Sequence, residues 1–188
     1  MHIVNTVVPW MIAFLYLILQ VQASFEDDVL DEHNKYRKKH GCPKLELDSS
    51  LNDDCKKYAE EIAGANALKH SDGPYGENLC YTSSNPVTCV KNWYDEIKDY
   101  DYDKAVFSPA TGHFTQLVWK SSKTLGVGKH SNPDGVTYVV ARYKPAGNVE
   151  GQFKQNVPRA NRSANKQDCS KYLILYSWIF IVLFMQSS

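Results

Sequence analysis

The residues best suited to chemistry in this chain lie between Gly112 and Lys120. This stretch reads GHFTQLVWK and places a histidine, a hydroxyl, a side-chain amide and two large aromatic rings within nine residues. A histidine in such a setting can hold a metal ion or exchange a proton near neutral pH. An alternative interpretation is a half-buried helical turn, in which Trp119 packs into the core and His113 is simply hydrogen-bonded. The stretch alone does not decide between a functional site and a structural turn.

Five segments of the chain resemble motifs of the CAP superfamily of cysteine-rich secretory proteins, antigen-five allergens and plant pathogenesis-related proteins. They are HNKYR at 33–37, GENL at 76–79, WYDE at 93–96, GHFTQLVW at 112–119 and YKPAGN at 143–148. Many secreted relatives have a cysteine where this chain has Ala141, so the chain most resembles the Golgi-associated pathogenesis-related type. For His33 and Arg37 we expect an internal hydrogen-bonding pair that docks their helix, and no catalytic role.

The resemblance implies a cleft that gathers His70, Glu77, Glu96 and His113. Two neutral imidazoles are good ligands for Zn²⁺ or another divalent cation, and a carboxylate beside each ring can fix its tautomer. Because two protein ligands leave coordination positions open, we expect weak binding. A buried polar cluster that ties loops to the sheet is one alternative. Another is a metal-dependent peptidase or hydrolase, with a glutamate as base and a metal-bound water as nucleophile.

The sequence gives little direct support for catalysis. It contains neither an HExxH nor a GxSxG motif. Ser71 is a candidate nucleophile only because it adjoins His70, and adjacency in sequence is not hydrogen-bond geometry. We therefore assign no catalytic residue and expect binding rather than turnover.

Hydrophobic periodicity and turn residues predict the elements that must position these side chains. Apolar and aromatic residues recur at three- and four-residue steps from Phe25 to Tyr36, which predicts a helix capped by Ser24 and ended at Gly41. We also expect helices over 48–63 and 86–99, strands over 77–81, 124–128 and 136–143, and a turn at 132–135 between the last two strands.

The resemblance implies an α+β fold, a three-layer α-β-α sandwich with a mainly antiparallel central sheet, in a CAP domain spanning 24–155. Residues 1–23 are typical of a secretory signal peptide cleaved after Ala23, with an uncleaved signal anchor as the alternative. Residues 156–171 have the composition of a polar linker, within which Asn161 begins a glycosylation sequon. The apolar tail at 172–188 suits a removed glycolipid (GPI) signal, a short membrane segment, or a tail that packs or is clipped.

Secretion would allow the cysteines to form disulfides. The chain has five cysteines, and removal of the tail with Cys169 would leave four. We predict the pairs Cys42–Cys55 and Cys80–Cys89, each of which links neighbouring segments. The sequence does not exclude the other two connectivities of four cysteines.

The charges also bear on possible partners. The formal net charge is +0, so nothing global indicates nucleic-acid binding. Residues 24–103 carry ten Lys/Arg and eighteen Asp/Glu, whereas residues 104–171 carry eleven and three. These halves form either two solvated faces or a basic face toward anionic lipid. We expect a secreted or surface-anchored protein that binds a lipid or sterol, with a membrane tether through its tail. The alternatives are the peptidase and a ligand for an unknown extracellular protein.

Overall fold

A mixed four-stranded sheet forms the middle of the molecule. The structure is a computed structural model that describes residues 24–161. The strands lie in the order β1 (Glu46–Leu47), β3 (Thr124–Ser131), β4 (Thr137–Lys144) and β2 (Gly76–Thr82). Short β1 runs parallel to β3, and the other two pairings are antiparallel. The predicted α+β class with a mainly antiparallel sheet is therefore confirmed.

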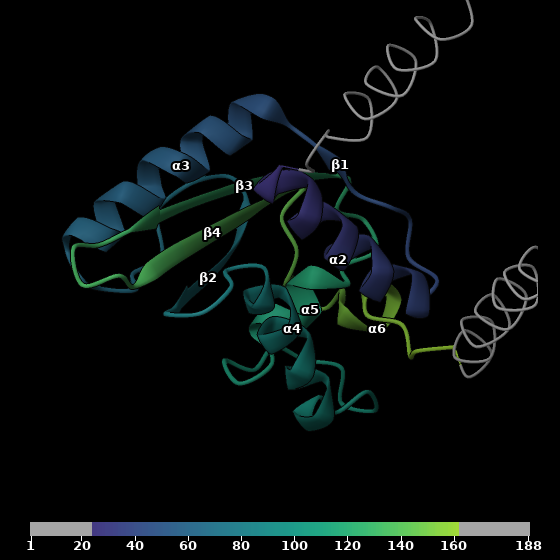
Figure 1. Cartoon of the computed structure of the whole chain (residues 1–188). Helices are drawn as coiled ribbons and strands as arrows, with labels where there is room; N and C mark the ends of the chain where they lie inside the picture. The colour runs from purple at the N-terminus through teal and green to yellow at the C-terminus, as the bar shows by residue number, and fades with distance from the viewer. Residues whose placement is uncertain (1–23, 162–188) are drawn as a thin grey trace, which may run out of the picture.

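Helices cover both faces of the sheet and complete three layers (Figure 1). Helix α3 (Ser49–Gly64) lies on one face. The other face is covered by α2 (Phe25–Lys39), α4 (Thr88–Asp95), α5 (Gly112–Leu117) and α6 (Phe153–Asn156). Residues of β4 alternate between the layers: Val139 and Ala141 join the core beneath α2, and Val140 joins the core beneath α3. This alternation follows from the two-residue period of a strand, and it aims the next even-numbered residue, Arg142, toward the α3 side.

The first helix has the predicted caps and the predicted buried polar residues. The Ser24 hydroxyl accepts from the Asp27 backbone N–H, and the Asp27 carboxylate accepts from Ser24 in return. His33 and Arg37 are fully buried. They do not bond to each other. His33 contacts Val29 and Tyr143, and Arg37 donates to the carbonyl oxygens of residues 43, 117, 119 and 122. Each residue thus docks α2 against other segments.

The helix predicted over 86–99 differs from the observed one. The Asn85 side chain accepts from the Val87 backbone N–H and forms a turn, and α4 begins only at Thr88. The helix then narrows into a 3₁₀ turn, η1 (Glu96–Asp99). This turn is the segment that carries Glu96.

The fold continues beyond the predicted domain boundary at residue 155. Asn156 and Val157 are buried, and Asn156 accepts hydrogen bonds from the backbone N–H groups of Lys120 and Ser121. The polar composition of this region predicted a linker, whereas its first residues pack against the domain. Exposed Asn161 is the last described residue. The predicted signal peptide, most of the linker and the apolar tail lie outside the described residues. No helix within 24–161 is long and apolar enough to cross a membrane.

One of the two predicted disulfides is absent. Cys80 and Cys89 are bonded and link β2 to α4, whereas Cys42 and Cys55 are free and buried. Cys42 belongs to the core under α2, and Cys55 on α3 belongs to the core on the other face. The sheet separates these cores, so the two thiols lie on opposite sides of it. A disulfide requires the two side chains to meet, so the predicted Cys42–Cys55 pair is wrong.

Candidate functional site

His70, Glu77 and His113 line one cleft at an end of the sheet. The cleft encloses about 260 Å³, and its lining also includes Asn78, Phe107, Pro109, Gly112 and Asn148. His70 comes from the loop before β2, Glu77 from β2 itself, and His113 from the first turn of α5. Asn78 ties two of these elements together, because its side-chain amide donates to the carbonyl oxygen of His113, 3.1 Å away.

The His113 ring is held by Glu96 on η1. The His113 Nδ1 atom lies 2.6 Å from Glu96 Oε1. The other oxygen, Oε2, accepts from the backbone N–H groups of His113 and Phe114, at 3.0 and 3.1 Å. The indole ring of Trp93 stacks against the imidazole, with ring centroids 6.2 Å apart. One carboxylate therefore fixes both the start of α5 and the ring that α5 presents to the cleft.

The His70 ring is held by Glu77 in a more deeply buried network. His70 Nδ1 lies 2.9 Å from Glu77 Oε1, which also accepts from the Ser71 backbone N–H. Glu77 Oε2 accepts from the Ser71 hydroxyl at 2.6 Å and from Arg142 Nε at 3.0 Å. The Glu77 side chain is only 5% exposed, whereas that of His70 is 62% exposed.

The ionisation of this pair follows from its contacts. Burial raises the pKa of Glu77, but hydrogen bonds from His70, Ser71 and Arg142 outweigh burial and hold the pKa below its ordinary value. The hydrogen bond to ionised Glu77 raises the pKa of His70, although burial opposes it. Glu77 is thus an anion that accepts a hydrogen bond from the Nδ1–H group of His70.

His70 and His113 are the two residues of the cleft lining whose ring nitrogens could serve as ligands for a divalent cation. A carboxylate that accepts from Nδ1–H fixes the neutral tautomer whose Nε2 carries the lone pair. Both rings meet this condition and both line the same cleft. Among residues 24–161 no cluster of three or more His, Cys, Asp or Glu side chains could hold a metal. The donor set is therefore two imidazoles, and the other coordination positions would be left to water or a partner.

The family is shown by comparison with known proteins. Residues 30–143 match the model of the CAP, or cysteine-rich secretory protein, family. The chain belongs to the CAP family. This CAP chain is 47% identical over 141 residues to human Golgi-associated plant pathogenesis-related protein 1, covering 71% of this chain and 92% of that protein. The resemblance seen in the sequence motifs is thus confirmed.

A further relative and a solved structure are informative. Secreted protein RBT4 of Candida albicans is 38% identical over 133 residues, covering 68% of this CAP chain and 36% of RBT4. The crystal structure of NaASP2 with Zn²⁺ has a TM-score of 0.57 and 23% identity, covering 71% of this chain and 84% of that one. At this identity the structural likeness shows the fold alone.

Ser71 is not arranged as a nucleophile beside a histidine base. Its hydroxyl donates to Glu77 Oε2, and it accepts from Arg142 Nη2, 2.9 Å away. A serine nucleophile needs a base that takes its proton and is itself oriented by a third group. Here the hydroxyl is held by the carboxylate that also accepts from His70, so the position of Ser71 is that of a bridging residue.

The sequence did not lead us to expect Arg142, whose guanidinium is buried beside Glu77. Arg142 is the one charged residue of the otherwise apolar and aromatic stretch 138–143 in β4, and its side chain is 6% exposed. A charged residue inside such a strand was a usable signal, because buried charges require a partner. The partner could not be identified from the sequence, since 65 positions separate Arg142 from Glu77.

Proposed function

We propose that this CAP chain is an extracellular binding protein whose cleft takes a divalent cation such as Zn²⁺ between His70 and His113. One observation carries the proposal: both rings contact a glutamate through Nδ1 and line the same cavity. The name of the NaASP2 structure, which includes Zn²⁺, supports the choice of metal. We propose binding rather than hydrolysis for two reasons. Ser71 contacts a carboxylate and a guanidinium instead of an imidazole. Glu77 and Glu96, the glutamates that could activate a metal-bound water, each already accept hydrogen bonds from a histidine ring and from the backbone.

In this proposal each residue has a separate task. His70 and His113 would hold the cation through Nε2, and Glu77 and Glu96 would hold the ring tautomers that keep those lone pairs available. A bound cation would offer open positions to a donor atom of a partner molecule. The affinity would be weak, because a closed structural zinc site uses four protein ligands and this cleft offers two.

Zinc titration of the chain, produced by a eukaryotic secretory host, tests the proposal. We expect calorimetry to detect one zinc site in the wild type and none in the double variant His70→Ala/His113→Ala. His130→Ala is the matched control, because His130 is an exposed histidine on β3 away from the cleft lining. Absence of zinc binding by the folded wild type, or equal binding by the double variant, would overturn the proposal.

Lipid or sterol binding is the second candidate. Val106 and Phe107 are 48% and 47% exposed on the loop before α5, and Phe107 also lines the cleft. Exposed apolar residues beside a cavity favour an apolar ligand or a membrane surface. Trp93 and Trp119 are buried, so they belong to the core rather than to a ligand surface. We expect Val106→Ser/Phe107→Ser to reduce flotation with sterol-containing vesicles, and unchanged flotation would argue against this candidate.

Secretion remains part of the proposal. RBT4 is named a secreted protein, whereas the human relative is named Golgi-associated, so the relatives' names indicate more than one compartment. We propose the extracellular location because residues 1–23 have the composition of a signal peptide and because Cys80 and Cys89 are bonded. Attachment to a membrane through residues 172–188 and an extracellular protein partner remain predictions.

A further inference from the structure

His70 is an exposed side chain whose position depends on buried neighbours. Among the described residues, the Glu77 carboxylate is the hydrogen-bond partner of its ring. An exposed imidazole on a loop would otherwise sample several rotamers and both neutral tautomers. The orientation of His70 therefore depends on what holds Glu77.

Arg142 is the charged group that holds Glu77. Its Nε donates to Glu77 Oε2 at 3.0 Å, and its Nη2 donates to the Ser71 hydroxyl, which donates to the same oxygen. Both side chains of the ion pair are about one-twentieth exposed. Because Arg142 and Ser71 occupy Oε2, the carboxylate is fixed with Oε1 toward His70 Nδ1.

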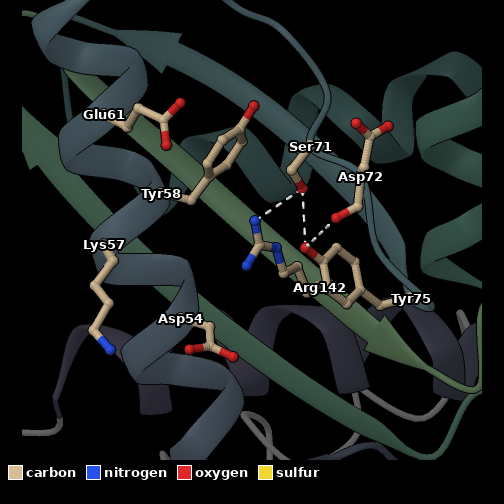
Figure 2. Close-up of a pocket in the computed structure, with 8 residues that line it drawn as sticks. All are labelled: Asp54, Lys57, Tyr58, Glu61, Ser71, Asp72, Tyr75 and Arg142. Atoms are coloured by element: carbon tan, nitrogen blue, oxygen red, sulfur yellow. Dashed lines mark hydrogen bonds between the residues drawn. The ribbon is translucent and has the colours of Figure 1, made fainter.

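The guanidinium of Arg142 is itself clamped between two aromatic rings, as Figure 2 shows. Its central carbon lies 4.9 Å from the ring centroid of Tyr58 on α3 and 4.3 Å from that of Tyr75. The Tyr58 hydroxyl donates to the carbonyl oxygen of Lys69, the residue before His70. Arg142 on β4 and Tyr58 on α3 thus hold both the carboxylate partner and the backbone of His70.

The two histidines of the cleft are supported in different ways. Glu96, which holds His113, accepts two backbone N–H groups and is 22% exposed. Glu77 is paired with a buried cation as well as with Ser71. A change at Arg142 should therefore affect His70 and leave His113 in place.

We propose that Arg142 is a positioning residue for metal binding: it locks Glu77 so that His70 presents Nε2 to the cleft. The inference rests on the proposed cation site and names a residue that acts through Glu77 without touching the metal. Loss of a residue that orients a metal ligand typically lowers affinity by about 10- to 100-fold. A lysine can pair with Glu77 but cannot form the planar fork to Glu77 and Ser71, so it should restore the function only in part.

Two measurements on the full chain test the inference. Nitrogen-15 NMR of the zinc-free protein, at a pH where the His70 ring is neutral, should show His70 as the Nδ1–H tautomer. Arg142→Gln should shift it toward a tautomer mixture, while the His113 signals stay unchanged and report that the fold is intact. Zinc calorimetry should then show a loss of affinity of at least about tenfold in Arg142→Gln and a smaller loss in Arg142→Lys.

A milder variant and a control keep the test decisive. Ser71→Ala removes one donor to Glu77 Oε2 without removing a buried charge, and a smaller affinity loss of the same kind is expected. Arg159→Gln is the matched control, because Arg159 is an exposed arginine paired with Asp103. If Arg142→Gln fails to fold, Ser71→Ala and Arg142→Lys decide the question by the same two measurements.

The outcomes separate the inference from the proposed function. Unchanged His70 tautomer and zinc affinity in the Arg142 and Ser71 variants would overturn the inference while leaving the zinc site standing. A wild type that binds no zinc would overturn the proposed function. The tautomer change in zinc-free protein would then still decide whether Arg142 positions His70.

Discussion

Acid should destabilise this fold through His33, which is fully buried on α2. Its Nδ1–H donates to the carbonyl oxygen of Val29 at 2.7 Å, so the unprotonated Nε2 accepts from the Tyr143 hydroxyl at 2.8 Å. The Tyr143 oxygen also accepts from the Asn78 side-chain amide. Protonation of Nε2 would turn an acceptor into a donor. It would also place a charge beside Arg37, so the neutral ring is strongly preferred.

The size and sign of the effect follow from the pKa of His33. Burial lowers this pKa to about 4, with a further lowering by Arg37 and an opposing hydrogen bond to Val29. In the unfolded chain the pKa is about 6.5. Between these values the unfolded chain binds more protons, so the free energy of unfolding falls as pH falls from about 6.5 to about 4. At about 1.4 kcal/mol per pH unit, the His33 contribution lost is about 3 kcal/mol.

Denaturant unfolding from pH 7 to pH 4, with and without His33→Gln, isolates this contribution. Glutamine stays neutral at every pH, and we expect it to cost about 1–3 kcal/mol at pH 7 through the buried hydrogen bonds it disturbs. From pH 7 to pH 4 the free energy of unfolding of the wild type should therefore fall by about 3 kcal/mol more than that of the variant. The stability advantage of the wild type at pH 7 should then be lost or reversed at pH 4. Parallel stability curves over this range would refute the assignment of His33 as a buried neutral ring.

Two further predictions concern stability. Cys80→Ser/Cys89→Ser should lower the free energy of unfolding by about 2–3 kcal/mol through the freed loop, and a reductant should destabilise the wild type but not this variant. Gly128→Ala should cost about 1–3 kcal/mol or more, because an added Cβ would overlap the backbone of Lys56 where α3 crosses β3. Gly64→Ala is its control, since a Cβ there meets nothing within 4 Å. Chemical denaturation measures all three, and equal stability of the two alanine variants would contradict the close approach of helix and strand.

Local elements were predictable because their signals lie close together in the sequence. The cap at Ser24 and the apolar stripe up to Tyr36 specify α2, and the turn at residues 132–135 specifies the hairpin of β3 and β4. The prediction was less accurate at 86–99, where the helix starts later and ends as a 3₁₀ turn. It also failed at Asn156 and Val157, because a polar segment that packs in a single turn has no periodicity to detect.

The family motifs named the residues of the candidate site, but they did not indicate the residue that holds Glu77 in place. The family motifs implied that His70, Glu77, Glu96 and His113 meet, and the structure places His70, Glu77 and His113 at one cleft, with Glu96 bonded to His113. The role of Arg142 was not predictable, because it depends on the pairing of β2 with β4 that sets Arg142 opposite Glu77.

The sequence by itself determined the side chains available for chemistry and the motifs that carry the family resemblance, and through that resemblance it implied the α+β class. Only the tertiary structure decided which side of the sheet each residue faces. That choice separates Cys42 from Cys55 and joins Glu77 to Arg142. The physical reason is that strand pairing and helix docking bring together residues distant in sequence, and no local pattern encodes their distance.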